Sequence, residues 1–464
     1  MKKVFELKIE GDLHTPIGIY RSIQEKKKIL LESSLKHEQQ GRYSFIGASP
    51  FMELYTSGGV TIEKDSDGNR KEHTGRFLDK VKQLMPKEAG LASAYPFIGG
   101  AVGYVGYDII REYEDIGAIP ADELNMPDAH LMFFRDVIVY DHMLQQISIV
   151  SIGEEAEEAE FAARAEKLAA SIRNNRQHEQ EENMLKADTQ FTSERKKEDF
   201  EQMVRAAKEE IAKGEIFQVV LSERFSADFS GDAFQFYRIL RKRNPSPYMF
   251  YIDFEDYQVV GSSPESLLKG DGRQVRTNPI AGTRRRGLTP EEDAVLEAEL
   301  LKDVKELAEH KMLVDLGRND LGRVCGIGTV ELTKFMDIEK YKYVMHIVSE
   351  VEGTMREGLD NTDVLASCLP AGTVSGAPKI RAMSIINEYE KVKRNVYGGA
   401  VGYFSSHGAF DFALAIRTMV VKGGKATIQA GAGIVHDSDP EREYEEVLNK
   451  AKALMEVQYD LVNR

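Results

Sequence analysis

The alternation of apolar and polar positions predicts strands in the first part of the chain. From Phe5 to Glu10 apolar and charged residues alternate, which is the period of a strand with one buried face. Two apolar runs, residues 133–139 and 145–150, are separated by residues 140–144 and predict a β-hairpin. We therefore expect residues 1 to about 150 to be rich in antiparallel sheet.

The apolar spacing becomes helical over residues 154–173, and residues 174–183 are almost wholly polar, which indicates a linker. Beyond it, the pattern predicts helices over residues 196–213, 290–314, 378–389 and 441–461, and strands over residues 398–404 and 426–430. This mixture predicts an α+β protein. We divide it into an N-terminal part, residues 1–185, and a C-terminal part, residues 186–464.

One hexapeptide, Gly-Gly-Ala-Val-Gly-Tyr, occurs twice, at residues 99–104 and 398–403. Its glycine spacing differs from the dinucleotide-binding fingerprint. Small residues in a strand favour close approach of neighbouring strands, so we expect both copies near a sheet centre or a ligand.

Composition excludes several classes of protein. The 464 residues carry 61 Lys and Arg against 76 Asp and Glu, and a net charge of −15 argues against a nucleic-acid partner. No stretch approaches the roughly 20 apolar residues needed to cross a bilayer, and the N-terminus lacks the apolar centre of a signal peptide. The only cysteines, Cys325 and Cys368, favour a reducing compartment, so we expect a cytoplasmic protein without a membrane role.

Acidic residues at helical spacing form the first candidate site. Glu306 and Glu309 lie three apart beside a predicted apolar stripe, and Glu443, Glu446 and Lys450 have a similar spacing in a later helix. The stripe consists of Leu300, Leu301, Val304, Leu307 and Ala308. Two such helices facing each other would suit Mg²⁺, which takes one or two protein carboxylates. The alternative is a solvated acidic face.

Two glycine-containing loops, residues 370–378 and 431–433, could offer backbone N–H groups to an anion, although each could equally be an ordinary turn. Arg417 and His346 follow apolar runs. The alternative for Arg417 is a structural ion pair, and the alternative for His346 is a core histidine whose hydrogen bonds are satisfied. Together these features suggest a small, multiply anionic substrate held partly by a metal.

Several ordered segments of the chain resemble the chorismate-utilising enzymes. The matching segments are residues 279–284, 308–310 with 314–321, 345–349, 370–379, 415–418, 429–435 and 449–450. The resemblance implies a chorismate-utilising-enzyme fold, an α+β body in which two antiparallel sheets pack face to face as a β-sandwich with helices outside. It also implies that the N-terminal part contributes to this sandwich.

The resemblance further implies a role for each candidate residue. Glu309 and Glu446 would hold Mg²⁺, with Glu306 and Glu443 beside them through water. Arg417 and Tyr397 would bind the enolpyruvyl carboxylate of chorismate, and the amides of Gly431, Ala432 and Gly433 with Lys450 would bind the ring carboxylate. His346 and Thr373 would line the ring, and His346 is the candidate to assist pyruvate elimination.

One position discriminates between activities of the family. Members that make 4-amino-4-deoxychorismate, in the folate pathway, typically carry Lys where this chain has Ala281. Ammonia is therefore the expected nucleophile, supplied by a separate glutamine amidotransferase subunit, and the products would be anthranilate and pyruvate in the first step of tryptophan biosynthesis. Formation of 4-amino-4-deoxychorismate is the alternative activity. The alternative that is not an enzyme is a catalytically silent scaffold that senses tryptophan.

A second match lies at residues 30–33, 41–47 and 244–249. In the family these segments form a feedback site for L-tryptophan, which implies a regulatory pocket built from Leu31, Ser33, Pro245, Tyr248 and Met249. A plain core strand would explain the leucines at 30 and 31 but not the other residues.

Overall fold

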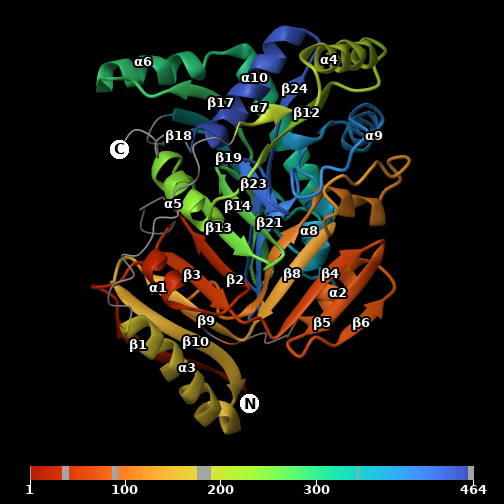
Figure 1. The fold of residues 1–464 in the computed structure, drawn as a ribbon. Helices are drawn as coiled ribbons and strands as arrows, with labels where there is room; N and C mark the ends of the chain where they lie inside the picture. Colours follow the sequence, from red (N-terminus) through yellow and green to blue (C-terminus); the bar gives the residue numbers. More distant parts are fainter. Residues whose placement is uncertain are drawn as a thin grey trace.

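The computed structural model describes residues 2–33, 41–85, 91, 93–174, 190–341 and 344–457. Within this part of the chain two antiparallel sheets of 12 strands each form the body of the molecule, and helices lie outside them (Figure 1). The predicted α+β sandwich of two packed antiparallel sheets is therefore confirmed. No helix of the described residues is long and apolar enough to cross a membrane.

The first sheet has the strand order β1 (Lys2–Glu10), β10 (Gln146–Glu154), β9 (Asp136–Asp141), β3 (Tyr43–Ala48), β2 (Lys28–Glu32), β13 (Tyr248–Asp253), β14 (Tyr257–Ser263), β23 (Thr418–Lys422), β24 (Lys425–Ile434), β12 (Gln218–Asp228) and β11 (Thr192–Ser193), with β20 (Gly376–Ala377) also paired to β12.

The second sheet has the order β17 (Ile280–Arg285), β19 (Val344–Thr354), β16 (Gln274–Thr277), β15 (Ser266–Asp271), β22 (Phe410–Leu414), β21 (Ala400–Ser405), β7 (Gly100–Val105), β8 (Ala129–Phe134), β4 (Met52–Ser57), β5 (Val60–Asp65) and β6 (Arg70–His73), with β18 (Glu331–Lys340) paired to β19. Both sheets thus take strands from both sides of residue 185.

The helices are α1 (Pro16–Ser22), α2 (Phe77–Leu84), α3 (Glu158–Arg173), α4 (Lys197–Ala212), α5 (Ala233–Arg243), α6 (Pro290–Leu300), α7 (Val304–Gly322), α8 (Asn361–Cys368), α9 (Lys379–Glu390) and α10 (Pro440–Met455), with 3₁₀ turns η1 (Tyr107–Glu112), η2 (Glu155–Glu157) and η3 (Gly372–Val374).

Strand alternation separates the core between the sheets from the cores beneath the helices. In β13, Phe250 and Ile252 pack between the sheets with Tyr403 of β21. Tyr251 points the other way, and its ring centroid lies 5.0 Å from that of Phe234 in α5. Because neighbouring residues of a strand face opposite sides, one strand serves two apolar layers.

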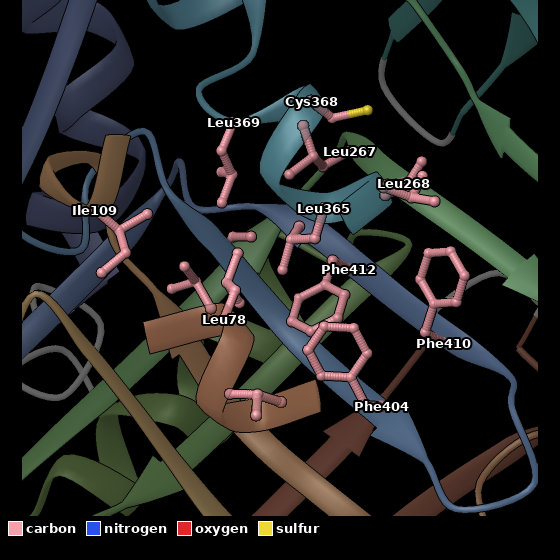
Figure 2. Close-up of a cluster of buried hydrophobic side chains, with 14 of the residues drawn as sticks. Leu78, Ile109, Leu267, Leu268, Leu365, Cys368, Leu369, Phe404, Phe410 and Phe412 are labelled. Carbon is pink, nitrogen blue, oxygen red and sulfur yellow. The ribbon is translucent and has the colours of Figure 1, made fainter. Parts of the chain in front are cut away.

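Helices α2 and α8 cover the outer face of the second sheet (Figure 2). Leu78 of α2 and Leu365 of α8 pack with Phe404 and Phe412, whose ring centroids are 4.7 Å apart. Cys368 lies in the same cluster. Both cysteines of the chain are buried, and burial raises the pKa of the Cys368 thiol to about 12.

The two copies of the repeated hexapeptide pair with each other. Strands β7 and β21 are antiparallel neighbours, and Gly103 lies opposite Gly402. A Cβ atom at Gly103 would lie 2.0 Å from the carbonyl oxygen of His130, and one at Gly402 would lie 2.0 Å from that of Asp411. The expected close packing at the sheet centre is confirmed, and these contacts explain the glycines.

Most predicted elements are present with shifted ends. The predicted helices over residues 154–173, 196–213, 378–389 and 441–461 correspond to α3, α4, α9 and α10. The hairpin is formed by β9 and β10, but Phe133 belongs to the preceding strand β8. Most of the predicted linker, from residue 175 on, and residues 458–461 of the last helix lie outside the described residues.

The single helix predicted over residues 290–314 is wrong. It is two helices, because α6 ends at Leu300 and α7 begins at Val304. The Asp303 side chain accepts the N–H groups of Lys305 and Glu306 and so caps the second helix. The predicted apolar stripe is also wrong, since Val304 is 81% exposed.

Candidate active site

Two backbone amides of β24 face away from the neighbouring strand β12. Gly431 lies opposite Ser222, and Gly433 lies opposite Val220. The N–H of Ser222 donates to Glu390 and that of Val220 to Ser375, so neither pair exchanges ladder hydrogen bonds. The N–H groups of Gly431 and Gly433 therefore point to the open edge of β24, whereas the N–H of Ala432 points into the ladder.

Side chains of the site approach the backbone closely at both glycines, and at Gly431 the carbonyl oxygen of Leu221 also leaves no room for a side chain. A Cβ at Gly431 would lie 2.6 Å from the hydroxyl of Tyr397, and one at Gly433 would lie 2.5 Å from Nε2 of Gln218. The expected cradle at residues 431–433 thus has the two outer glycine amides available and the hydroxyl of Tyr397 beside them.

Lys450 of α10 lies at the centre of the charged groups. Its Nζ donates to the carbonyl oxygen of Gly431 at 2.9 Å and forms an ion pair of 2.8 Å with Glu446. Burial raises the pKa values of Glu265, Glu309 and Glu443, and the positive charge of Lys450 partly opposes each of these shifts. Residues from four distant segments therefore meet around one cation.

Glu309 of α7 and Glu443 of α10 have surroundings that disfavour the charged forms of their carboxyl groups. Burial raises the pKa of both carboxyl groups, and the charges of Glu306 and Glu446 respectively raise them further. Glu306 itself is partly neutralised, since Arg284 Nη1 lies 3.3 Å from its Oε1.

These carboxylates fit a divalent cation that needs few protein ligands. Within the described ranges, no three His, Cys, Asp or Glu side chains are close enough to form a complete metal site. Mg²⁺ requires only one or two protein carboxylates and fills its shell with water and substrate oxygens. Gln218 donates to Glu309 at 3.3 Å, and its buried Oε1 has no hydrogen-bond partner. The carboxylates themselves are oxygen donors, as Mg²⁺ prefers.

Glu265 provides a weakly acidic carboxyl group in the site, and the sequence patterns did not identify it. Thr373 Oγ1 donates to its Oε1 at 2.8 Å. Burial raises the pKa of Glu265 to about 7, although the Thr373 bond and Lys450 oppose this shift. Near neutral pH the carboxyl group can therefore carry a proton, and the Thr373 contact leaves Oε2 as the position for it.

Arg417 lies close enough to His346 for its positive charge to lower the pKa of that histidine. Among the described residues no carboxylate forms an ion pair with Arg417, and burial lowers its pKa. Its φ of +47° is unusual for a residue other than glycine and is typical of positions under functional constraint. Two residues before Arg417, the carbonyl oxygen of Ala415 accepts the N–H of Gly398, so the backbone segments that carry Arg417 and Tyr397 lie side by side.

His346 is oriented by β17. Its Nδ1 lies 3.1 Å from the carbonyl oxygen of Gly282 and 3.0 Å from Oγ1 of Thr283. Because a carbonyl only accepts, Nδ1 carries the hydrogen and Nε2 keeps a lone pair. Burial and then the charge of Arg417 lower the pKa of His346, so the ring is neutral at pH 7.

Two functional candidates escaped the sequence patterns. One feature of the sequence could have identified Gln218, because it is a polar residue in the apolar run of residues 216–221. No sequence pattern could have identified Glu265, since it is a single carboxylate after Pro264 without a second acidic residue at helical or strand spacing.

A separate cavity of about 340 Å³ lies between the two sheets. It is lined by Leu31, Ser33, Tyr248 and Met249 of the predicted tryptophan pocket, whereas Pro247 takes the place expected for Pro245. Its other wall includes Ile280 of β17 and Val348 of β19, the strand pair that carries Gly282 and His346. The cavity therefore touches strands of both sheets.

Comparison with known proteins gives one consistent result. The family model described as chorismate binding enzyme matches residues 15–456. Anthranilate synthase component 1 of Acetivibrio thermocellus is 46% identical over 462 residues, covering 97% of this chain and 94% of the relative. The corresponding protein of Thermus thermophilus is 43% identical over 451 residues, covering 96% and 95%.

Solved structures agree with the sequence relatives. The crystal structure of anthranilate synthase component I from Streptococcus pneumoniae superposes with a TM-score of 0.81 at 41% identity and covers 96% of this chain and 98% of that one. The menaquinone-specific isochorismate synthase of Escherichia coli has a TM-score of 0.76 at 20% identity, with 99% and 95% covered, and shares the fold.

Proposed function

Because the chain belongs to the chorismate-binding enzyme family, we propose that it converts chorismate and ammonia to anthranilate, pyruvate and water. One observation carries this proposal. Lys450 bonds the carbonyl oxygen of Gly431 beside the edge amides of β24, and its charge acts on the weak acid Glu265. Arg417, which has no carboxylate partner among the described residues, acts in the same way on His346. The two cationic or N–H groups suit the two carboxylates of chorismate, and the acid suits departure of its hydroxyl group.

In this proposal the protein binds each carboxylate separately. The N–H groups of Gly431 and Gly433 and the ammonium group of Lys450 hold the ring carboxylate, and Arg417 with the Tyr397 hydroxyl holds the enolpyruvyl carboxylate. An arginine in surroundings that lower its pKa gains most from an anion, because the ligand replaces lost hydration.

Glu309 and Glu446 would hold Mg²⁺, with Glu306 and Glu443 acting through water. When bound, the ion would act as a Lewis acid toward the substrate and lower the cost of losing the 4-hydroxyl group. Glu265 Oε2 donates a proton to that departing hydroxyl, which leaves as water. The ammonium group formed at C2 releases one proton to solvent, from which Glu265 is reprotonated. Gln218 Oε1, a buried acceptor without a partner, orients the N–H of ammonia as it attacks C2.

His346 then assists pyruvate elimination. Its Nε2 accepts the proton from C2, the C3–O bond breaks, and the enolpyruvyl group leaves as pyruvate after taking up a proton. The neutral ring and the fixed Nδ1 hydrogen prepare this nitrogen as the base.

The residue at position 281 argues against the alternative product, 4-amino-4-deoxychorismate. Ala281 lies opposite Ile347 in the strand pair that orients His346, and its methyl group cannot act as a nucleophile. Incubating the purified chain with chorismate, Mg²⁺ and an ammonium salt, and identifying the product by chromatography and fluorescence, tests the proposal. Recovery of 4-amino-4-deoxychorismate, or of unchanged chorismate, would contradict it.

The chain alone should use ammonia but not glutamine. Both cysteines are 3% exposed, and a thiol whose pKa is raised is a poor nucleophile for glutamine hydrolysis. We expect glutamine to support turnover only after a glutamine amidotransferase subunit is added. Steady anthranilate formation from glutamine by the pure chain would refute this partner requirement.

The cavity between the sheets is proposed to bind L-tryptophan as an inhibitor. Residues 1–185 would then act mainly as the regulatory part and residues 186–464 as the chorismate-binding catalytic part, although they share both sheets. A volume of about 340 Å³ lies within the usual range for small-molecule sites. Because the cavity wall includes the strands behind His346, bound tryptophan can favour a state with weaker chorismate affinity.

Ser33→Arg should abolish tryptophan inhibition while leaving uninhibited turnover unchanged, because the larger charged side chain fills the cavity. The chain contains no tryptophan, so indole emission reports the ligand without protein background. Ser171→Arg, in α3 and away from the cavity, is the matched control and should stay inhibited. Unchanged indole emission on adding wild-type protein, together with full turnover in millimolar tryptophan, would disprove the regulatory proposal.

A further inference from the structure

A buried ion pair lies behind the proposed active site. Arg394 and Glu390 have side chains that are 1% and 2% exposed. Arg394 Nε donates to Glu390 Oε2 at 2.7 Å, and Nη2 donates to Oε1 at 2.5 Å. None of the groups assigned above to substrate binding or proton transfer is a member of this pair.

The pair occupies a gap in the pairing of β12. On its outer edge β12 pairs with β20 at Gln218 and Val219 and with β11 at Phe225 and Ser226. Between these short strands, Arg394 Nη2 donates to the carbonyl oxygen of Val220 at 2.8 Å. Glu390 Oε1 accepts the N–H and the hydroxyl group of Ser222, each at 2.8 Å. The two side chains thus bond backbone groups that a neighbouring strand would otherwise satisfy.

Three segments that carry proposed site residues meet at the Arg394 guanidinium. Its bond to Val220 fixes the strand that begins with Gln218, and Nη1 donates to the carbonyl oxygen of Val374, next to Thr373, at 2.6 Å. The guanidinium also lies 5.5 Å from the ring centroid of Tyr397. One planar cation therefore contacts the segments that carry the ammonia acceptor, the partner of Glu265 and a carboxylate-binding hydroxyl.

We infer that Arg394, held by Glu390, is a positioning residue that sets Gln218, Thr373 and Tyr397 relative to one another for turnover. The inference rests on the proposed function. A lysine cannot replace the arginine, because its single ammonium group lacks the fork that reaches Glu390, Val374 and Val220 together. A misplacement of about 1 Å at reacting groups can cost on the order of 10²-fold in rate.

Arg394→Lys is expected to lower kcat/KM for chorismate by about 10- to 100-fold. It should also move the alkaline limb of the kcat/KM profile to higher pH. The reason is that the Thr373 bond lowers the pKa of Glu265, and a loosened Val374 weakens that bond. A purely structural role would lower the unfolding temperature without moving this limb at temperatures well below unfolding.

The matched control is Arg164→Lys, which alters an arginine–carboxylate pair with Asp136 near the other end of the same sheet. It should keep wild-type kcat/KM. If Arg394→Lys does not fold, Glu390→Gln tests the same anchor, since it keeps the side-chain shape and removes the charge that holds Arg394.

Two results would overturn the inference. One is a folded Arg394→Lys or Glu390→Gln variant whose kcat/KM stays within twofold of wild type while its unfolding temperature falls. The other is an equal loss in the Arg164→Lys control with an unmoved pH limb. A wild-type chain that leaves chorismate unchanged would instead overturn the proposed function, and this inference with it.

Discussion

Glu265→Gln is expected to lower kcat/KM for chorismate by about 10²- to 10⁴-fold, because glutamine cannot donate the proton that the departing hydroxyl needs. In wild type the group must be protonated, and its pKa is about 7. Above pH 7, kcat/KM should therefore fall tenfold per pH unit. The variant should lack this limb. The profile is measured at a fixed concentration of unprotonated ammonia.

The chain offers a close control for this experiment. Glu112 also has a pKa raised to about 7 by burial, but its Oε2 accepts the N–H of Phe77, in α2. Glu112→Gln should keep both the rate and the alkaline limb. A Glu265→Gln variant with a wild-type profile, or a Glu112→Gln variant that loses the limb, would remove Glu265 from the proposed mechanism.

Stability gives an independent check on Glu265→Gln. A carboxyl group whose pKa is raised in the folded state destabilises that state above its unfolded pKa, since the charged form is disfavoured there. At pH 8 this penalty is present in wild type, and the neutral glutamine removes it. The unfolding temperature at pH 8 should therefore not fall, so a loss of activity cannot be attributed to unfolding.

Removal of Mg²⁺ is expected to abolish turnover, and Glu309→Gln should raise the half-saturating Mg²⁺ concentration by at least about 10- to 100-fold. Glu309→Gln removes one negatively charged ligand from a site in which burial already raises the carboxyl pKa values. Turnover is measured after chelation, on restoring Mg²⁺, and across a Mg²⁺ titration of the variant.

Asp315→Asn is the matched control, because Asp315 lies on the same helix with a side chain that is 70% exposed. Its Mg²⁺ titration should match wild type. Binding of Mn²⁺, a paramagnetic substitute for Mg²⁺, can be followed without turnover and should weaken in Glu309→Gln alone. Full activity in excess chelator, or equal titrations of Glu309→Gln and wild type, would disprove the metal proposal.

The fold could be predicted from local patterns wherever the pattern was long. Alternation identified the strand at residues 5–10, and helical spacing identified α4 and α9, because each buries one face and leaves the other in water. The pattern failed at residues 301–303. There the apolar residues continue at helical spacing, and the break depends on the cap that Asp303 makes in the folded chain.

The sequence by itself determined the residue types available for chemistry: the acidic pairs of α7 and α10, Lys450, Arg417, the glycines of β24 and the resemblance that relates them. Only the tertiary structure decided which of them act together. Strand register directs the N–H groups of Gly431 and Gly433 to an open edge and turns that of Ala432 into the ladder. Burial, which depends on packing of distant segments, gives Glu265 a pKa near 7 and leaves Gln218 Oε1 without a partner. These properties belong to surroundings assembled from both sheets, and no pattern within one segment can encode them.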